Sequence, residues 1–81
     1  MTKSDVFEKM KIKKGDFVAD FFVPYDELRT FRGTMEDAIR CGESMVREKF
    51  ARCGRVIGDI DIYNNVEIDS KVGVYFIGVC K

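Results

Sequence analysis

Acidic side chains recur at odd-numbered positions of the run "GDIDIYNNVEID", residues 58–69, and apolar side chains take most even-numbered positions. The acids are Asp59, Asp61, Glu67 and Asp69. Because successive side chains of a β-strand point to opposite faces, this spacing predicts a strand with one acidic face. The opposite face carries Ile60, Ile62, Val66 and Ile68. We expect a helix to cover that apolar face and solvent to cover the acidic one.

Two interpretations of the acidic face are open. It can be the ordinary wet side of an antiparallel sheet that is covered on one side only. It can also be a stripe of one charge sign that steers onto the basic groove of a nucleic-acid-binding protein and blocks it. The residues predicted to bind a partner are Asp59, Asp61, Glu67, Asp69, Tyr63 and Tyr75.

Asp59 and Asp61 are also a candidate carboxylate pair for acid–base chemistry. Strand geometry separates such side chains by about 6.6 Å, which is within the range that glycosidases use. The pattern around them indicates no pocket, and the chain contains no tryptophan to stack on a sugar. We therefore predict no catalytic residue and no enzymatic activity.

The chemistry open to the chain is further restricted because it contains no histidine. Serine–histidine and cysteine–histidine catalysis and most transition-metal sites are then excluded. The cysteines Cys41, Cys53 and Cys80 lack the Cys-x-x-Cys spacing of zinc sites. We expect them to be reduced, small core residues, and we predict no metal and no cofactor.

Composition indicates a single domain over residues 1–81. Fourteen basic and fourteen acidic side chains cancel, which argues against direct nucleic-acid binding. No apolar run of about 18 residues is present, so we expect no membrane association. The opening twenty residues contain no signal-peptide pattern, and we predict a cytoplasmic protein. Basic side chains gather at Lys9, Lys11, Lys13, Lys14, Arg47, Lys49, Arg52 and Arg55.

The strongest predicted element is a helix over residues 35–52, with Thr34 as its N-cap and Gly54 as its stop. Its expected apolar face consists of Met35, Ala38, Ile39, Gly42, Met45, Val46 and Phe50, and Cys53 can extend it. Gly42 on this face predicts a close approach by another element.

Strands are predicted on both sides of this helix. Residues 16–24 form one, ended by Pro24, and a helical turn closed by Gly33 follows it. Residues 55–68 form a long strand with a bulge at Asn64–Asn65 and unbroken even-numbered parity, although a hairpin at these asparagines is an alternative. A turn at residues 69–71 leads to a last strand over 72–80. That strand is apolar on both faces, so it is either central or part of an interface.

The predicted fold is α+β, with one helix packed on an antiparallel sheet and a core order β-α-β-β. Residues 4–10 can add a short helix capped by Ser4, or residues 9–17 can add a strand that turns at Lys14–Gly15, and we favour this hairpin arm. The predicted core is Phe21, Ile39, Met45, Val46, Phe50, Ile60, Ile62 and Phe76. One helix would leave Tyr75, Ile77 and Val79 uncovered, which favours an oligomeric or partner interface.

The stretch "CGRVIGDIDIYNNVEID…VGVYFIGVC" resembles the YbjQ-like proteins, small domains of the dodecin-like β-α-β-β type. The matching residues are Gly54, Val56, Ile57, Gly58, Ile60, Asp61, Tyr63, Gly78 and Val79. The resemblance implies a ring-forming oligomer with no assigned catalysis. The metal-binding role attached to that family does not transfer, since the chain has no histidine.

Two functions are therefore expected as alternatives. The first is a non-catalytic binding protein, such as a phage or mobile-element inhibitor that blocks a nucleic-acid-binding partner with its acidic face. The second is a homo-oligomeric domain of the YbjQ or dodecin-like type that binds a small ligand or acts as a scaffold.

Overall fold

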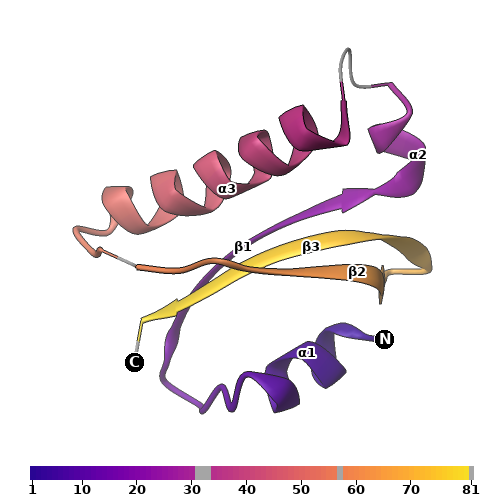
Figure 1. Ribbon diagram of the computed structural model, residues 1–81. Helices are drawn as coiled ribbons and strands as arrows, with labels where there is room; N and C mark the ends of the chain where they lie inside the picture. The colour runs from indigo at the N-terminus through magenta and orange to yellow at the C-terminus, as the bar shows by residue number, and fades with distance from the viewer. Residues whose placement is uncertain (31–33, 57, 81) are drawn as a thin grey trace.

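A three-stranded antiparallel sheet lies between two helices in the computed structural model, which describes residues 1–30, 34–56 and 58–80 (Figure 1). In chain order the elements are α1 (Lys3–Lys9), β1 (Phe17–Pro24), α2 (Tyr25–Leu28), α3 (Met35–Arg52), β2 (Asp61–Ile68) and β3 (Lys71–Cys80). The predicted α+β class and the β-α-β-β core order are confirmed. None of the helices in these ranges has the length and apolarity needed to cross a bilayer.

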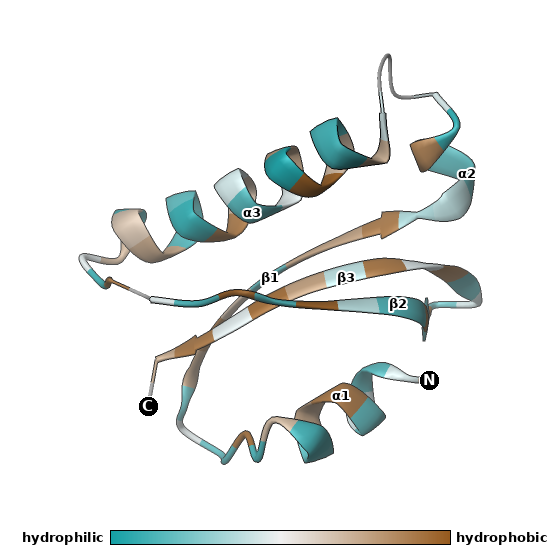
Figure 2. Cartoon of the chain, in the orientation of Figure 1, coloured by the Kyte–Doolittle hydropathy of each residue, from teal (hydrophilic) through white to brown (hydrophobic). Residues whose placement is uncertain are grey.

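The last strand, β3, is the central strand of the sheet, in the order β1-β3-β2. Its side chains alternate between two buried clusters, with Val74 and Phe76 in one and Tyr75 and Ile77 in the other. Figure 2 shows β3 as a largely apolar strand between α3 and α1. The central position predicted for this strand is confirmed, and it explains why both of its faces are apolar.

Helix α3 begins and ends where its capping signals predict. Thr34 and Asp37 form a reciprocal capping box at its start. At its end the Arg55 N–H donates to the Phe50 carbonyl at 2.8 Å and the Gly54 N–H donates to the Ala51 carbonyl at 3.0 Å. Gly54 has a φ of +69°, so these bonds form a Schellman motif, which glycine adopts without strain.

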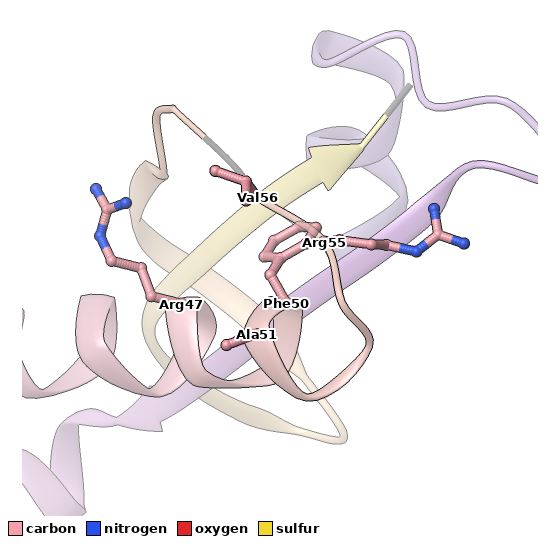
Figure 3. A pocket seen from close by; sticks show the side chains of 5 residues that line it. All are labelled: Arg47, Phe50, Ala51, Arg55 and Val56. Carbon is pink, nitrogen blue, oxygen red and sulfur yellow. The ribbon is translucent and has the colours of Figure 1, made fainter.

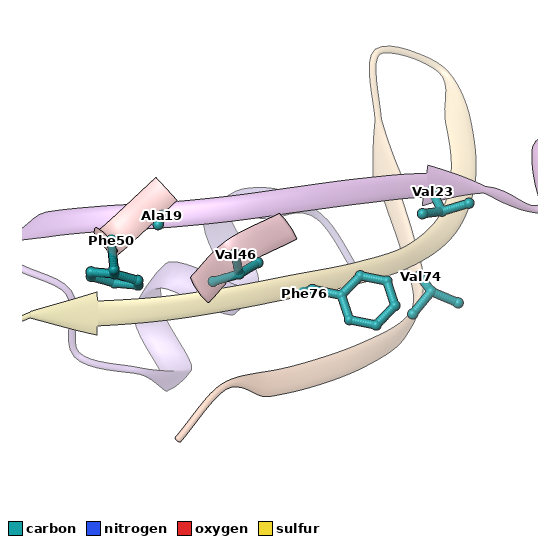
Figure 4. Packing of buried hydrophobic residues seen from close by; sticks show 6 residues of the cluster. All are labelled: Ala19, Val23, Val46, Phe50, Val74 and Phe76. Atoms are coloured by element: carbon teal, nitrogen blue, oxygen red, sulfur yellow. The ribbon is translucent and has the colours of Figure 1, made fainter. Parts of the chain in front are cut away.

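One face of α3 packs on β1 and β3 (Figure 4). The buried residues of this core are Ala19, Val23, Val46, Phe50, Val74 and Phe76. The predicted close approach at Gly42 is confirmed, because a Cβ atom there would lie 2.5 Å from Cε2 of Phe76. The side chains of β1 alternate between the two faces, since Phe17 and Phe21 pack on this cluster and Val18 and Phe22 pack on the other.

Two methionines of the expected helix face are exposed, Met35 at 53% and Met45 at 37%. The prediction of Met45 as a core residue is therefore wrong. Helix α3 contacts the edge strand β1 more than the central strand. The flank that carries Met45 and Lys49 therefore lies at the rim of the sheet, and Lys49 bonds Asp20 there.

The prediction of an N-terminal hairpin arm is wrong, and the alternative, a short helix, is present as α1. Its N-cap is Thr2 rather than Ser4, because Thr2 and Asp5 form a capping box. The Asp5 N–H donates to Thr2 Oγ1 at 3.2 Å and the Thr2 N–H donates to Asp5 Oδ2 at 2.8 Å. Val6 of this helix is buried beside Tyr75 and Ile77. The face of β3 that was expected to be uncovered is therefore covered by α1.

The strand predicted over residues 55–68 is shorter than expected, since β2 begins at Asp61. Val56 is 91% exposed, as expected for a residue that leaves the Schellman motif without joining the sheet. The helical turn predicted after β1 is present as α2, with Pro24 as its N-cap. The predicted role of Gly33 lies outside the described residues.

Candidate functional site

Strand β2 contains the bulge that was predicted at its asparagines. Tyr63 pairs with Tyr75, but the next pair is Val66 with Gly73, so β2 holds one extra residue there. Asn65 has a φ of +57°. Its N–H donates to the Tyr25 hydroxyl at 3.0 Å, and that hydroxyl donates to Asn65 Oδ1 at 3.0 Å. The side chain of Tyr25 thus holds the bulge from α2.

The bulge reverses the alternation of β2, so the prediction of unbroken parity is wrong. Ile62 packs in the cluster beneath α3, whereas Val66 and Ile68 pack in the cluster beneath α1. Asp61 stands opposite Ile77 and therefore lies on the α1 side of the sheet, while Glu67 stands opposite Val72 on the α3 side. The acids consequently do not share one face, because the extra residue rotates the chain by one position.

The four acids are nevertheless exposed along one edge of the sheet, since β2 is an edge strand in the described part of the chain. We call Asp59, Asp61, Glu67 and Asp69 the acidic edge. Asp59 precedes β2, and Asp69 lies in the predicted turn to β3 with a φ of +52°. Within the described residues none of these four carboxylates forms an ion pair.

The two predicted tyrosines occupy different environments. Tyr63 is half-buried, and burial together with the negative charge of Asp61 raises its pKa. Tyr75 is only 1% exposed, and its hydroxyl donates to Asp20 Oδ2 at 2.5 Å. Burial and the Asp20 carboxylate raise the pKa of Tyr75 far above its ordinary value. Tyr75 therefore belongs to the core beneath α1, and the acidic edge and Tyr63 are what a partner can reach.

Asp20 is a central residue that the sequence interpretation missed. Besides the Tyr75 hydroxyl, its carboxylate faces Lys49 Nζ at 3.5 Å and Lys3 Nζ at 3.9 Å. Lys49 also donates to the Asp20 backbone carbonyl. The available signal was an acid inside the apolar run "DFVADFFVP". This network joins α1, β1, α3 and β3, so its role is structural.

A second feature that the sequence did not reveal is a cavity of about 200 Å³ at the C-terminal end of α3 (Figure 3). Its lining consists of Arg47, Phe50, Ala51, Arg55 and Val56. The Arg55 guanidinium lies over the Phe17 ring, 4.4 Å from its centre. Arg47 Nη2 donates to the Gly58 carbonyl at 3.4 Å. The arginines were visible in the sequence as part of a basic region, but the apolar floor between them was not.

Among the described residues no group of histidine, cysteine, aspartate and glutamate is arranged to hold a metal ion. Cys41 and Cys53 are exposed, so the prediction that they are core residues is wrong. Both lie outside the buried face of α3, which is formed by Ala38, Gly42, Val46 and Phe50. Cys80 is half-buried at the end of β3.

The chain matches no protein-family model, no curated protein and no solved structure. The resemblance of its C-terminal half to the YbjQ-like proteins therefore stays a prediction.

Proposed function

We propose that the chain is a non-catalytic binding protein that docks its acidic edge on a basic surface of another protein. The observation that supports this proposal is the exposure of four carboxylates along β2, none of them paired with a cation in the described residues. Ion pairs elsewhere in the chain engage Asp20 and Glu48 instead. The negative charge of β2 is thus available to a partner.

Exposed carboxylates along one edge of the sheet suit a groove that normally receives phosphates. Oppositely charged surfaces accelerate encounter and select the partner more than they raise affinity. A nucleic-acid-binding protein offers such a groove, and a phage or mobile-element inhibitor is the class of protein that would block it. The half-buried Tyr63 adds an aromatic contact beside Asp61.

The test compares the wild type with a variant in which all four acids of the acidic edge are replaced by serine. Both proteins serve as bait in a host lysate, and the affinity for each captured partner is then measured with and without competing nucleic acid. We expect the variant to lose the partner and the wild-type affinity to fall steeply between about 50 and 200 mM salt.

The matched control neutralises four exposed acids elsewhere, Glu8, Asp26, Glu27 and Glu36, with glutamine or asparagine. It removes the same charge but leaves the acidic edge intact, so it should still retain the partner. Equal recovery of one partner by the wild type and the serine variant would contradict the proposal. Equal loss in both variants would show that net charge, and not the position of the acids, determines binding.

The cavity at the end of α3 favours a second candidate function, a homo-oligomeric domain of the YbjQ or dodecin-like type that binds a small ligand or acts as a scaffold. Its apolar floor and flanking arginines are the usual composition of a ligand site, although its volume of about 200 Å³ is small. Light scattering at micromolar concentration tests the oligomer. A stable monomer would contradict the ring that the resemblance implies.

A further inference from the structure

We propose that the cavity at the C-terminal end of α3 binds a small carboxylate with a compact apolar body, such as an aromatic acid. This inference rests on the second candidate function and specifies its ligand. The cavity holds about 200 Å³. One water occupies about 30 Å³ of liquid, so the space matches the size of a single ring with its carboxylate.

The apolar part of the site is formed by Phe50, Ala51 and Val56. Phe50 forms the rigid base of this floor, because its ring packs edge-on against Phe17 at 5.5 Å between centroids, but it is only 1% exposed. The apolar surface that a ligand can reach is therefore mainly that of Ala51 and Val56. Val56 is 91% exposed at the rim, which is unusual for a branched apolar side chain beside a cavity. A bound ring would cover part of Val56 and remove that apolar surface from water.

The charged part of the site is Arg55. Its guanidinium lies over the Phe17 ring at 4.4 Å, and within the described residues it forms no ion pair and its side chain donates no hydrogen bond. Stacking restricts the plane of the guanidinium and leaves the N–H groups at its edge for a carboxylate. Such a pair is bidentate, and it is stronger than a hydrogen bond between neutral groups.

Arg47 extends on the other side of Phe50, so positive charge flanks the apolar floor at both ends (Figure 3). None of the described residues that line the cavity is acidic. The C-terminus of a helix ordinarily repels an anion. Here the carbonyls of Phe50 and Ala51 are already bonded in the Schellman motif.

The test titrates the folded, full-length protein with benzoate and follows the backbone amide NMR signals of residues 47–56. Benzyl alcohol is the neutral probe of the same shape, and acetate is the anionic probe without a ring. We expect benzoate to shift these signals and to bind about two- to fivefold more tightly than benzyl alcohol, since an ion pair at the exposed Arg55 contributes up to about 1 kcal/mol. Benzoate should also bind more tightly than acetate, because acetate makes the same pair but has no ring to cover Val56.

Three variants locate the interaction. Arg55→Gln should weaken benzoate binding about two- to fivefold, and Arg55→Lys should recover only part of it, because lysine keeps the charge but loses the planar fork. Val56→Asp changes a side chain that is 91% exposed, so it should leave the fold intact while its carboxylate repels the ligand. Arg40→Gln, an exposed position on the same helix, is the matched control and should bind as the wild type does.

Equal binding of benzyl alcohol and benzoate would overturn this inference while leaving a ligand-binding function in place. Unchanged benzoate affinity in both Arg55→Gln and Val56→Asp would also overturn it, since the ligand would then bind elsewhere. The absence of any benzoate shift in a protein that is oligomeric by light scattering would remove the ligand and leave the scaffold function.

Discussion

The hydrogen bond between Tyr75 and Asp20 provides a quantitative test of the core beneath α1. Replacement of Tyr75 by phenylalanine deletes one hydroxyl and leaves the ring in place. The lost bond joins the hydroxyl of Tyr75, a residue that is 1% exposed, to a carboxylate whose side chain is 30% exposed. Hydrogen bonds to charged groups contribute about 1.5–3 kcal/mol, so Tyr75→Phe should lower the free energy of unfolding by about that amount.

Asp20→Ala should be at least as destabilising, because it leaves the buried Tyr75 hydroxyl without a partner. That desolvation costs about 1–3 kcal/mol, and the two lysine contacts, which are largely exposed, add about 0–1 kcal/mol each. In the double variant the orphaned hydroxyl is absent. Its free energy of unfolding should therefore be no lower than that of Asp20→Ala alone, with a coupling energy of at least about 1 kcal/mol.

The assay is urea unfolding at neutral pH, followed by far-UV circular dichroism. Tyr63→Phe is the matched control, because Tyr63 lies directly across from Tyr75 and its hydroxyl forms no hydrogen bond within the described residues. That control should change stability by no more than about 0.5 kcal/mol. Additive effects of Tyr75→Phe and Asp20→Ala would refute the reasoning, since they would show that the two groups do not interact.

Three further predictions follow from local geometry. The raised pKa of Tyr75 means that the folded state keeps the phenol proton at a pH near 10, where the unfolded chain begins to lose it. The stability that this group contributes is therefore complete below about pH 10 and declines above it by about 1.4 kcal/mol per pH unit. In urea unfolding, Tyr75→Phe should show a smaller alkaline decline than the wild type, and identical declines would contradict this. Ser70 has a φ of +67° in the β2–β3 turn, so Ser70→Gly should stabilise the protein by about 0.5–1 kcal/mol and raise its melting temperature, whereas Ser44→Gly on the exposed side of α3 should destabilise it by about 0.5 kcal/mol. Thr2→Ala removes the capping box of α1 and should lower the free energy of unfolding by about 1 kcal/mol. Amide hydrogen exchange at Val66 and Ile77, beneath α1, should become faster than in the control Ser4→Ala, which keeps the capping box.

The bounds of helix α3 were predictable because its capping signals are local. Thr34, Asp37 and Gly54 define its ends through bonds that span only a few residues, and the Gly42 position follows from its period. Helix α1 had a local signal of the same kind in Thr2 and Asp5, but the lysines after it and the β-like "KMKIKKGDF" pattern favoured a hairpin. The capping box of Thr2 and Asp5 thus determines the structure of this segment, and the β-like alternation after it does not.

The reversal of β2 could not be predicted from its own residues. A bulge at Asn64–Asn65 was expected, but its consequence depends on the exact register with β3 and on Tyr25, which is 40 residues away from Asn65 in the chain. The cavity has the same origin, because it forms only where residues after Gly54 pass Phe17 and Phe50. Contacts between distant residues determine both features, and periodicity carries no information about them.

The edges of the sheet bear on how any partner can bind. An edge strand with free backbone groups invites another strand, and bulges, charges and covering segments oppose this. On β2 the bulge interrupts the edge, Thr2 bridges Glu67, and the Glu67 N–H donates to the Met1 carbonyl at 2.7 Å. On β1 Lys49 occupies the Asp20 carbonyl. The β2 edge is thus obstructed for strand addition, and the acids of β2 contribute to that obstruction whether or not a partner exists. A partner of the acidic edge would consequently recognise side-chain charge rather than backbone, which is why salt sensitivity is the decisive property in the binding experiment.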